Sequence, residues 1–279
     1  MTAKKTKWRR YEGEAFEYSS QLLKKNWARL HRGDREPFPD AAFVKALAPL
    51  APDGDAGDTA AILQDAWRAY HRGDFEDAFM LGASLGPIGA NVANKAANIQ
   101  ATYLERDHDA KLALFLDVVR RAETLQKAAP NLANGWYLYA QALGRYSQGI
   151  SVAKALAEGH GGKIKAALER ALEIEPKHAD AHIALGAFHA NVVNKVGGMA
   201  ARLTFGATKE AALEHYEAAL KLAPDYAVAH IEYANGLAML FGKAKLVEAT
   251  QHYEQAAGFE PVDAMEWLDV ELAKAEVAD

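Results

Sequence analysis

The sequence contains no cysteine among its 279 residues. A disulfide framework, a thiol nucleophile and a cysteine-ligated metal site are therefore excluded. Proline occurs only nine times and glycine 21 times, which excludes a collagen-like or proline-rich fibre. No stretch of about 18 consecutive apolar residues occurs, so we expect no membrane span. With 50% hydrophobic residues, the chain is too apolar to be mostly disordered.

Alanine is the residue that the chain has in excess, with 59 copies. Alanine has the highest helix propensity, and its small side chain lets two helices lie close together. A chain of this length buries a sizeable core, as one large domain or two smaller ones. The composition therefore predicts an all-α protein.

The net charge of −5 is unevenly distributed. The first ten residues carry five basic side chains and no acid, so the rest of the chain sums to −10. We expect these basic residues in a solvated, frayed terminus: Lys4, Lys5, Lys7, Arg9 and Arg10. An acidic body repels phosphates, which argues against nucleic acid as a partner. No apolar signal segment follows Arg10 and no cysteine is available for a lipid anchor, so we expect a cytoplasmic protein.

The first 56 residues are expected to form an N-terminal helical cap. Apolar residues recur three and four apart over residues 14–32, which predicts one amphipathic helix. Asp40 is placed to cap a second, short helix. Residues 50–57 are rich in Gly, Pro and Asp, as loops are. We therefore divide the chain into a cap, 1–56, and a repeat region, 57–279.

Similar helical segments recur in the second part of the chain, each ended by a proline: Pro130, Pro176, Pro224 and Pro261. An alanine lies five residues before each of the last three prolines: Ala171, Ala219 and Ala256. A large ring lies six residues after each proline: Trp136, His182, His230 and Trp267. A small residue at a fixed point lets the second helix of a pair lie against the first, and proline ends the helix. The recurrence predicts a series of paired helices.

This pattern resembles the tetratricopeptide repeat (TPR) family over roughly residues 58–279. The resemblance implies a right-handed α-solenoid of helix pairs, preceded here by the N-terminal helical cap. The family's period is 34 residues, whereas the proline spacings are 46, 48 and 37. The two large insertions fall near 145–159 and 191–208, and both carry apolar residues at helical spacing. We therefore expect lengthened first helices and short inserted helices that fold back on the solenoid.

A narrower likeness rests on the segment Gly197–Gly206 and the helix that follows it, Ala211–Leu220. This part resembles the helical proteins associated with bacterial tripartite (TRAP-type) transporters and the regulator of microtubule dynamics family. The first likeness implies a helical protein that binds a ligand or a partner.

No pattern in the sequence indicates catalysis, a metal or a cofactor. His178 and His182 are four residues apart, but His182 stands where the repeat places a packing ring, so we expect packing or capping. The run Gly159–Lys163 lacks the Ser or Thr that a phosphate loop needs, because Ile164 follows it. The carboxylates are spread along predicted helices. We therefore predict that the chain is not an enzyme and holds no cofactor.

Polar residues occupy the positions that line the concave groove in the repeat family. These candidate binding residues are Asn94, Asn98, Asn134, Tyr137, Gln141, Arg145, Asn191, Asn194 and Asn235. A side-chain amide both donates to and accepts from a peptide backbone, which suits peptide binding. The first hypothesis is thus a non-catalytic scaffold that binds a protein or peptide in its groove; self-association is left open.

The alternative hypothesis is a small-molecule-binding transporter-accessory protein, in which the apolar insertions close a pore or pocket over the groove. The two hypotheses differ in what the insertions cover. An open polar groove favours a peptide, whereas a closed apolar cavity favours a small ligand.

Overall fold

The structure is a computed structural model that describes residues 8–278, and every regular element in this part of the chain is helical. The all-α prediction is confirmed. The helices are α1 (Ser20–Leu30), α2 (Ala41–Ala46), α3 (Ala56–Arg72), α4 (Phe75–Ser84), α5 (Ala90–Ile99), α6 (His108–Ala128), α7 (Ala133–Gln148), α8 (Val152–Ala157), α9 (His160–Ile174), α10 (Ala179–Val196), α11 (Gly198–Phe205), α12 (Lys209–Leu222), α13 (Ala227–Phe241), α14 (Leu246–Ala257) and α15 (Ala264–Ala278). Short 3₁₀ or π turns are η1 (Ala48–Leu50), η2 (Gly86–Gly89), η3 (Gln100–Leu104) and η4 (Gly242–Lys245).

The expected basic start, Lys4 to Lys7, lies outside the described residues. Within residues 8–278, no helix combines the length and the hydropathy needed to cross a lipid bilayer.

Side-chain caps fix where the first helices begin. Asp40 accepts a hydrogen bond from the Phe43 N–H at 2.9 Å, so the predicted cap of α2 is confirmed. The predicted helix over 14–32 is too long at its start. The helix begins at Ser20 because the Ser19 hydroxyl accepts from the Leu22 N–H at 3.3 Å. The residues before it are extended, and the Tyr18 hydroxyl donates to the Val262 carbonyl at 2.6 Å.

Three of the four rings that follow the prolines have a common hydrogen-bonding role. Trp136 Nε1–H donates to the Pro130 carbonyl at 2.9 Å. The imidazole Nε2 atoms of His182 and His230 lie 3.3 and 2.9 Å from the carbonyls of Pro176 and Pro224. A ring N–H thus satisfies a carbonyl just beyond the end of the preceding helix, and both Trp and His can supply it.

The helices pack as successive pairs. Extensive contacts join α7 to α9, α10 to α12 and α13 to α14. Ala171, Ala219 and Ala256 are each fully buried, as the sequence predicted. The predicted insertions appear as the short helices α8 and α11, each placed between the two helices of a pair.

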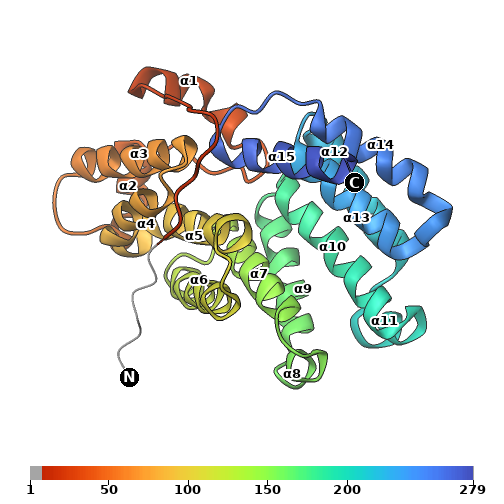
Figure 1. Cartoon of the computed structure of the whole chain (residues 1–279). Coiled ribbons are helices and arrows are strands. Elements are labelled where there is room, and N and C mark those ends of the chain that lie inside the picture. The colour runs from red at the N-terminus through yellow and green to blue at the C-terminus, as the bar shows by residue number, and fades with distance from the viewer. Residues whose placement is uncertain (1–7, 279) are drawn as a thin grey trace.

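The N-terminal segment joins the two ends of this row of helices (Figure 1). The last helix, α15, packs on α13 and α14 and also contacts α3. His71 Nδ1 of α3 lies 2.7 Å from Asp263 Oδ2, with both side chains buried. Arg29 of α1 pairs with Glu266 of α15 at 3.0 Å. Polar contacts therefore join α1 and α3, near the start of the chain, to the last helix and the residues just before it.

Candidate functional site

Residues 31–36 form a loop that lies against α5, α7 and α10. The Gly33 carbonyl accepts from the Asp180 N–H of α10 at 3.0 Å, and the Asp34 carbonyl accepts from the Asn134 amide of α7 at 2.9 Å. The Asp34 carboxylate pairs with Lys95 of α5. Asn134, one of the candidate binding residues, thus donates to a backbone carbonyl, but this carbonyl lies in a turn of the chain itself.

A second carboxylate of the same loop, Glu36, is buried between α5 and α7. It accepts hydrogen bonds from the amides of Asn91 at 3.0 Å and Asn134 at 2.6 Å. Burial raises the pKa of Glu36 to about 7, and the nearby Asp34 carboxylate raises it too, although both amides act in the opposite direction. The space between α5 and α7 therefore accommodates this carboxyl group partly in its protonated form at neutral pH.

Asp34 behaves in the opposite way. Burial alone would raise its pKa, but Lys95 and His31 outweigh burial and hold the pKa well below its usual range. Asp34 is only 2% exposed, so removing its partner Lys95 would leave the Asp34 carboxylate as a buried charge without compensation. The loop is thus fixed by charge as well as by hydrogen bonds.

Gly33 is required by the closeness of this packing. A Cβ atom at this position would lie 2.4 Å from Asp180 Oδ1 and 2.6 Å from Tyr226 Cε1. A larger residue here would force the buried Asp180 and Tyr226 side chains, or the loop itself, to move.

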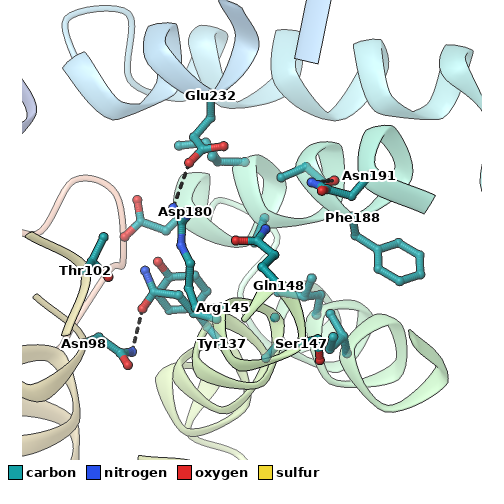
Figure 2. Close-up of a pocket in the computed structure, with 18 of the residues that line it drawn as sticks. Asn98, Thr102, Tyr137, Arg145, Ser147, Gln148, Asp180, Phe188, Asn191 and Glu232 are labelled. Carbon is teal, nitrogen blue, oxygen red and sulfur yellow. Dashed lines mark hydrogen bonds and ion pairs between the residues drawn. The ribbon is translucent and has the colours of Figure 1, made fainter. Parts of the chain in front are cut away.

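A pocket of about 230 Å³ lies beside the loop, between α7 and α10. Two stripes with four-residue spacing line it, Tyr137–Gln141–Arg145 on α7 and Ile183–Ala187–Asn191 on α10. Four-residue spacing places side chains on one helical face, so these stripes follow directly from the sequence register. In Figure 2, Arg145 rises from α7 towards Glu232, and Phe188 lies on the other side of the pocket.

One end of the pocket is polar. Arg145 pairs with Glu232 of α13 at 2.9 Å, and the Tyr103 hydroxyl donates to Asp269 of α15. Two deeply buried carboxylate oxygens here, Asp180 Oδ1 and Asp269 Oδ2, have no hydrogen-bond partner within the described residues. Burial raises the pKa of Asp180 to about 6 and that of Asp269 to about 8. This end therefore offers two carboxyl groups that each have one oxygen without a hydrogen-bond partner.

The other end of the pocket is apolar and is built largely by the inserted segments. Its lining includes Val152, Leu156, Val192, Val196 and Phe205, which the sequence placed in the two insertions. The Ile164 and Leu168 side chains of α9 complete this part. Apolar residues of the two insertions therefore line this cavity.

The candidate residues divide into two groups. Those that line the pocket are Asn98, Tyr137, Gln141, Arg145 and Asn191. Those that do not are Asn94, Asn134, Asn194 and Asn235.

Each residue of the second group has a physical reason for its place. Asn94 is fully buried and accepts from Arg121 at 2.6 Å, and Asn134 is engaged by the N-terminal loop. Asn194 is exposed beyond the pocket. Asn235 accepts from the Tyr253 hydroxyl of α14 at 2.6 Å, because the stripe of α13 that faces the pocket is Val228 and Glu232.

The sequence did not single out Tyr103, Asp180 or Asp269 as part of the site. Tyr103 lies in a π turn that extends α5. Asp269 lies on the last helix, α15, which contacts α3 near the start of the chain and so reaches the pocket. No local spacing signals either contact. Among the described residues, no group of three or more His, Asp or Glu side chains has the arrangement of a metal site.

The fold and the site define an all-helical protein with a pocket whose lining runs from Lys95 to Asp269. Residues 90–276, about two thirds of the chain, match the sequence model of the family described as Regulator of microtubule dynamics protein 1-3. The chain belongs to this family. The whole pocket lies inside the matched region, whereas the loop 31–36 lies outside it. No curated protein matches the chain.

The family assignment confirms the likeness to the regulator of microtubule dynamics family, whereas the likeness to the TRAP-transporter-associated proteins stays a prediction. The wider assignment to the TPR family stays a prediction, as does the division into a cap and a repeat region.

Proposed function

We propose that the chain is a non-catalytic binding protein whose ligand is a small amphiphile held in the pocket between α7 and α10. The observation that carries this proposal is the joining of an apolar end, lined by the insertions, to a polar end around Arg145 and Asp269. Burial of an aliphatic chain stabilises a complex by about 0.8 kcal/mol per CH₂ group. A few polar groups at one end then fix the orientation of the ligand.

The geometry favours this function over an extended peptide in the groove. The amides of Asn91 and Asn134 are occupied by the chain's own loop. Farther along the groove, the Asn98 amide donates to Gln141 Oε1 at 2.7 Å, so these two amides satisfy each other. The free space that is left is polar at one end only, and its apolar end does not suit a polar peptide backbone.

The polar end also restricts the head group of the ligand. Asp180 Oδ1 and Asp269 Oδ2 lack partners, and a buried polar atom without a partner is costly. Because the pKa of Asp269 is raised to about 8, its carboxyl group is protonated at neutral pH and needs an acceptor, whereas Asp180 Oδ1 needs a donor. A hydroxyl head group both donates and accepts, so it satisfies both atoms. The ligand class is therefore an amphiphile with a hydroxyl head group.

We further interpret the helix pairs as TPR-like repeats of a right-handed α-solenoid, with α8 and α11 as inserted helices. The fully buried alanines and the shared bonding of Trp136, His182 and His230 support this interpretation. A protein partner is the second candidate function, favoured by the family's name, which refers to regulation of microtubule dynamics. Such a partner would bind outside the pocket, where Asn194 and Asn235 are exposed.

The test is to incubate the purified protein with a total extract of cellular small molecules and to identify what stays bound by native mass spectrometry. The variant Ala187→Trp fills the pocket, and Ala166→Trp places the same ring on the exposed face of α9 as a matched control. We expect one bound amphiphile in the wild type and the control and none in Ala187→Trp. A wild type that retains nothing after this incubation contradicts the proposal.

A further inference from the structure

The exposed apolar side chains of this protein are concentrated in three connections. Within residues 8–278, eleven large apolar side chains are exposed; four of them lie between the two helices of a pair and two more lie on the first turn of the second helix of a pair. These six are Val152 and Leu156 on α8, Met199 and Leu203 on α11, and Leu246 and Val247 at the start of α14. Met199 and Leu203 are 80% and 81% exposed, the largest values of the eleven.

The three connections lie at the same end of the helix pairs, because each follows the first helix of its pair. In Figure 1, α8 and α11 both lie along the lower edge of the molecule. Phe205 at the end of α11 packs next to Gly161 of α9, which directly follows α8. Lys209, at the start of α12, donates to the Leu240 carbonyl of α13 at 2.8 Å, next to η4. We define the docking edge as residues 149–163, 194–210 and 242–248.

The docking edge is basic, although the protein is acidic. Its seven basic residues are Lys154, Lys163, Lys195, Arg202, Lys209, Lys243 and Lys245. Its three acids are Glu158, Glu210 and Glu248. Seven minus three is +4, and since the whole chain carries −5, all other residues together carry −9. The electrostatic field of the molecule therefore orients the protein so that this edge faces an anionic surface.

We propose that the docking edge binds the surface of an anionic lipid membrane, with the Met199 and Leu203 side chains of α11 inserted between the head groups. Apolar side chains interspersed with basic residues on short surface helices are typical of segments that lie in a membrane interface. Basic residues next to an anionic leaflet each strengthen the partition by about fivefold.

The composition of the edge fits a lipid surface better than a protein partner. Six of its seven basic residues are lysine, which is depleted from the buried centres of protein–protein interfaces. None of its six exposed apolar residues is aromatic, whereas tryptophan and tyrosine dominate the binding energy of protein interfaces. The six side chains also come from three separate connections, as a broad, shallow surface requires.

The proposal goes beyond the ligand proposed above and does not depend on it. Met199 and Leu203 do not line the pocket, so their substitution leaves the pocket's lining unchanged. Binding of a soluble ligand in the absence of vesicles tests the pocket, and binding of empty vesicles tests the edge. The failure of one proposal is therefore distinguishable from the failure of the other.

The first experiment is flotation of the full chain with vesicles of phosphatidylcholine alone and of phosphatidylcholine with phosphatidylserine. We expect binding to the anionic vesicles only, weakened by high salt because salt screens exposed charges. The double variant Met199→Ser/Leu203→Ser should bind about tenfold or more weakly, since two inserted side chains are lost. Met80→Ser on α4, at an equally apolar exposed position, is the control and should bind as the wild type does.

The charge contribution is tested with Lys163→Glu/Arg202→Glu, and Lys127→Glu/Lys177→Glu supplies the same charge change away from the edge. All four residues are exposed. We expect the first pair to lose vesicle binding and the second pair to keep most of it. Equal losses in the two pairs, or no binding of the wild type to anionic vesicles, overturn the proposal.

The lack of cysteine allows a direct measurement of insertion, because one introduced thiol is unique. A polarity-sensitive dye is attached to Met199→Cys and, as a control, to Met80→Cys. With anionic vesicles, the emission should shift to the blue at position 199 and stay unchanged at position 80. A shift at neither position, or the same shift at both, contradicts insertion of α11.

Discussion

Single buried carboxyl groups link the stability of this protein to pH, and Glu36 is the clearest case. Its folded pKa is raised to about 7 from the ordinary 4.5, mainly by burial. Between these two values the folded state holds a proton that the unfolded state has released. The stability that comes from this group is thus fully present below about pH 4.5 and is lost as the pH rises through 7.

Glu36→Gln removes this titration, so we expect its stability relative to the wild type to increase between pH 5 and pH 8. The change is on the order of 3 kcal/mol if the whole shift is realised. The new amide has an available acceptor, because Asn91 Oδ1 has no partner among the described residues. Urea unfolding of both proteins at the two pH values measures the effect. Equal changes of the free energy of unfolding in the two proteins would show that Glu36 has the same pKa in the folded and unfolded states.

The sequence predicts which side chains share a helix face better than it predicts which residues they contact. The register of α7 correctly indicates that Tyr137, Gln141 and Arg145 share one face, because four-residue spacing is a local property. The partner of Asn134 is Glu36, which lies 98 positions away. No spacing rule connects such distant positions, so the sequence could not predict that the groove is partly occupied.

Helix pairing depends on small residues at fixed points, and α9 offers a matched test. Ala171 is fully buried, whereas Ala166 on the same helix is exposed. Ala171→Leu should lower the free energy of unfolding by roughly 1–3 kcal/mol, because it overpacks a filled contact. Ala166→Leu should stay within about 0.5 kcal/mol of the wild type. Urea unfolding of the two variants decides the matter; equal midpoints would mean that Ala171 does not lie at a tight contact.

At the scale of elements, helix ends and insertions could be read from the sequence because prolines, caps and apolar spacing are local signals. The start of α1 could not be predicted from such local signals. The periodicity over 14–32 predicts a longer helix, but Ser19 caps it and Tyr18 bonds to the Val262 carbonyl at the far end of the chain. A long-range contact here competes with local helix formation, and propensity alone does not reveal it.

At the scale of the whole molecule, the contact of α15 with α3 and the loop 31–36 determine what space is left. The N-terminal segment fills part of the surface that the repeat pattern marks as a groove. The insertions line the remainder with apolar side chains. The free volume is therefore a short amphiphilic pocket instead of an open polar groove, which is the distinction on which the two functional hypotheses depend.

The most direct test of this account is an equilibrium titration with cis-parinaryl alcohol, a fluorescent fatty alcohol whose hydroxyl head can donate a hydrogen bond, followed by its emission without vesicles. The account predicts saturable binding of one molecule to the wild type and to Ala166→Trp. It predicts an affinity about tenfold or more lower for Ala187→Trp, a loss of roughly 1.4 kcal/mol or more, at unchanged helix content. Equal affinities for all three proteins, or no saturable binding to the wild type, would contradict the assignment of the pocket as the ligand site.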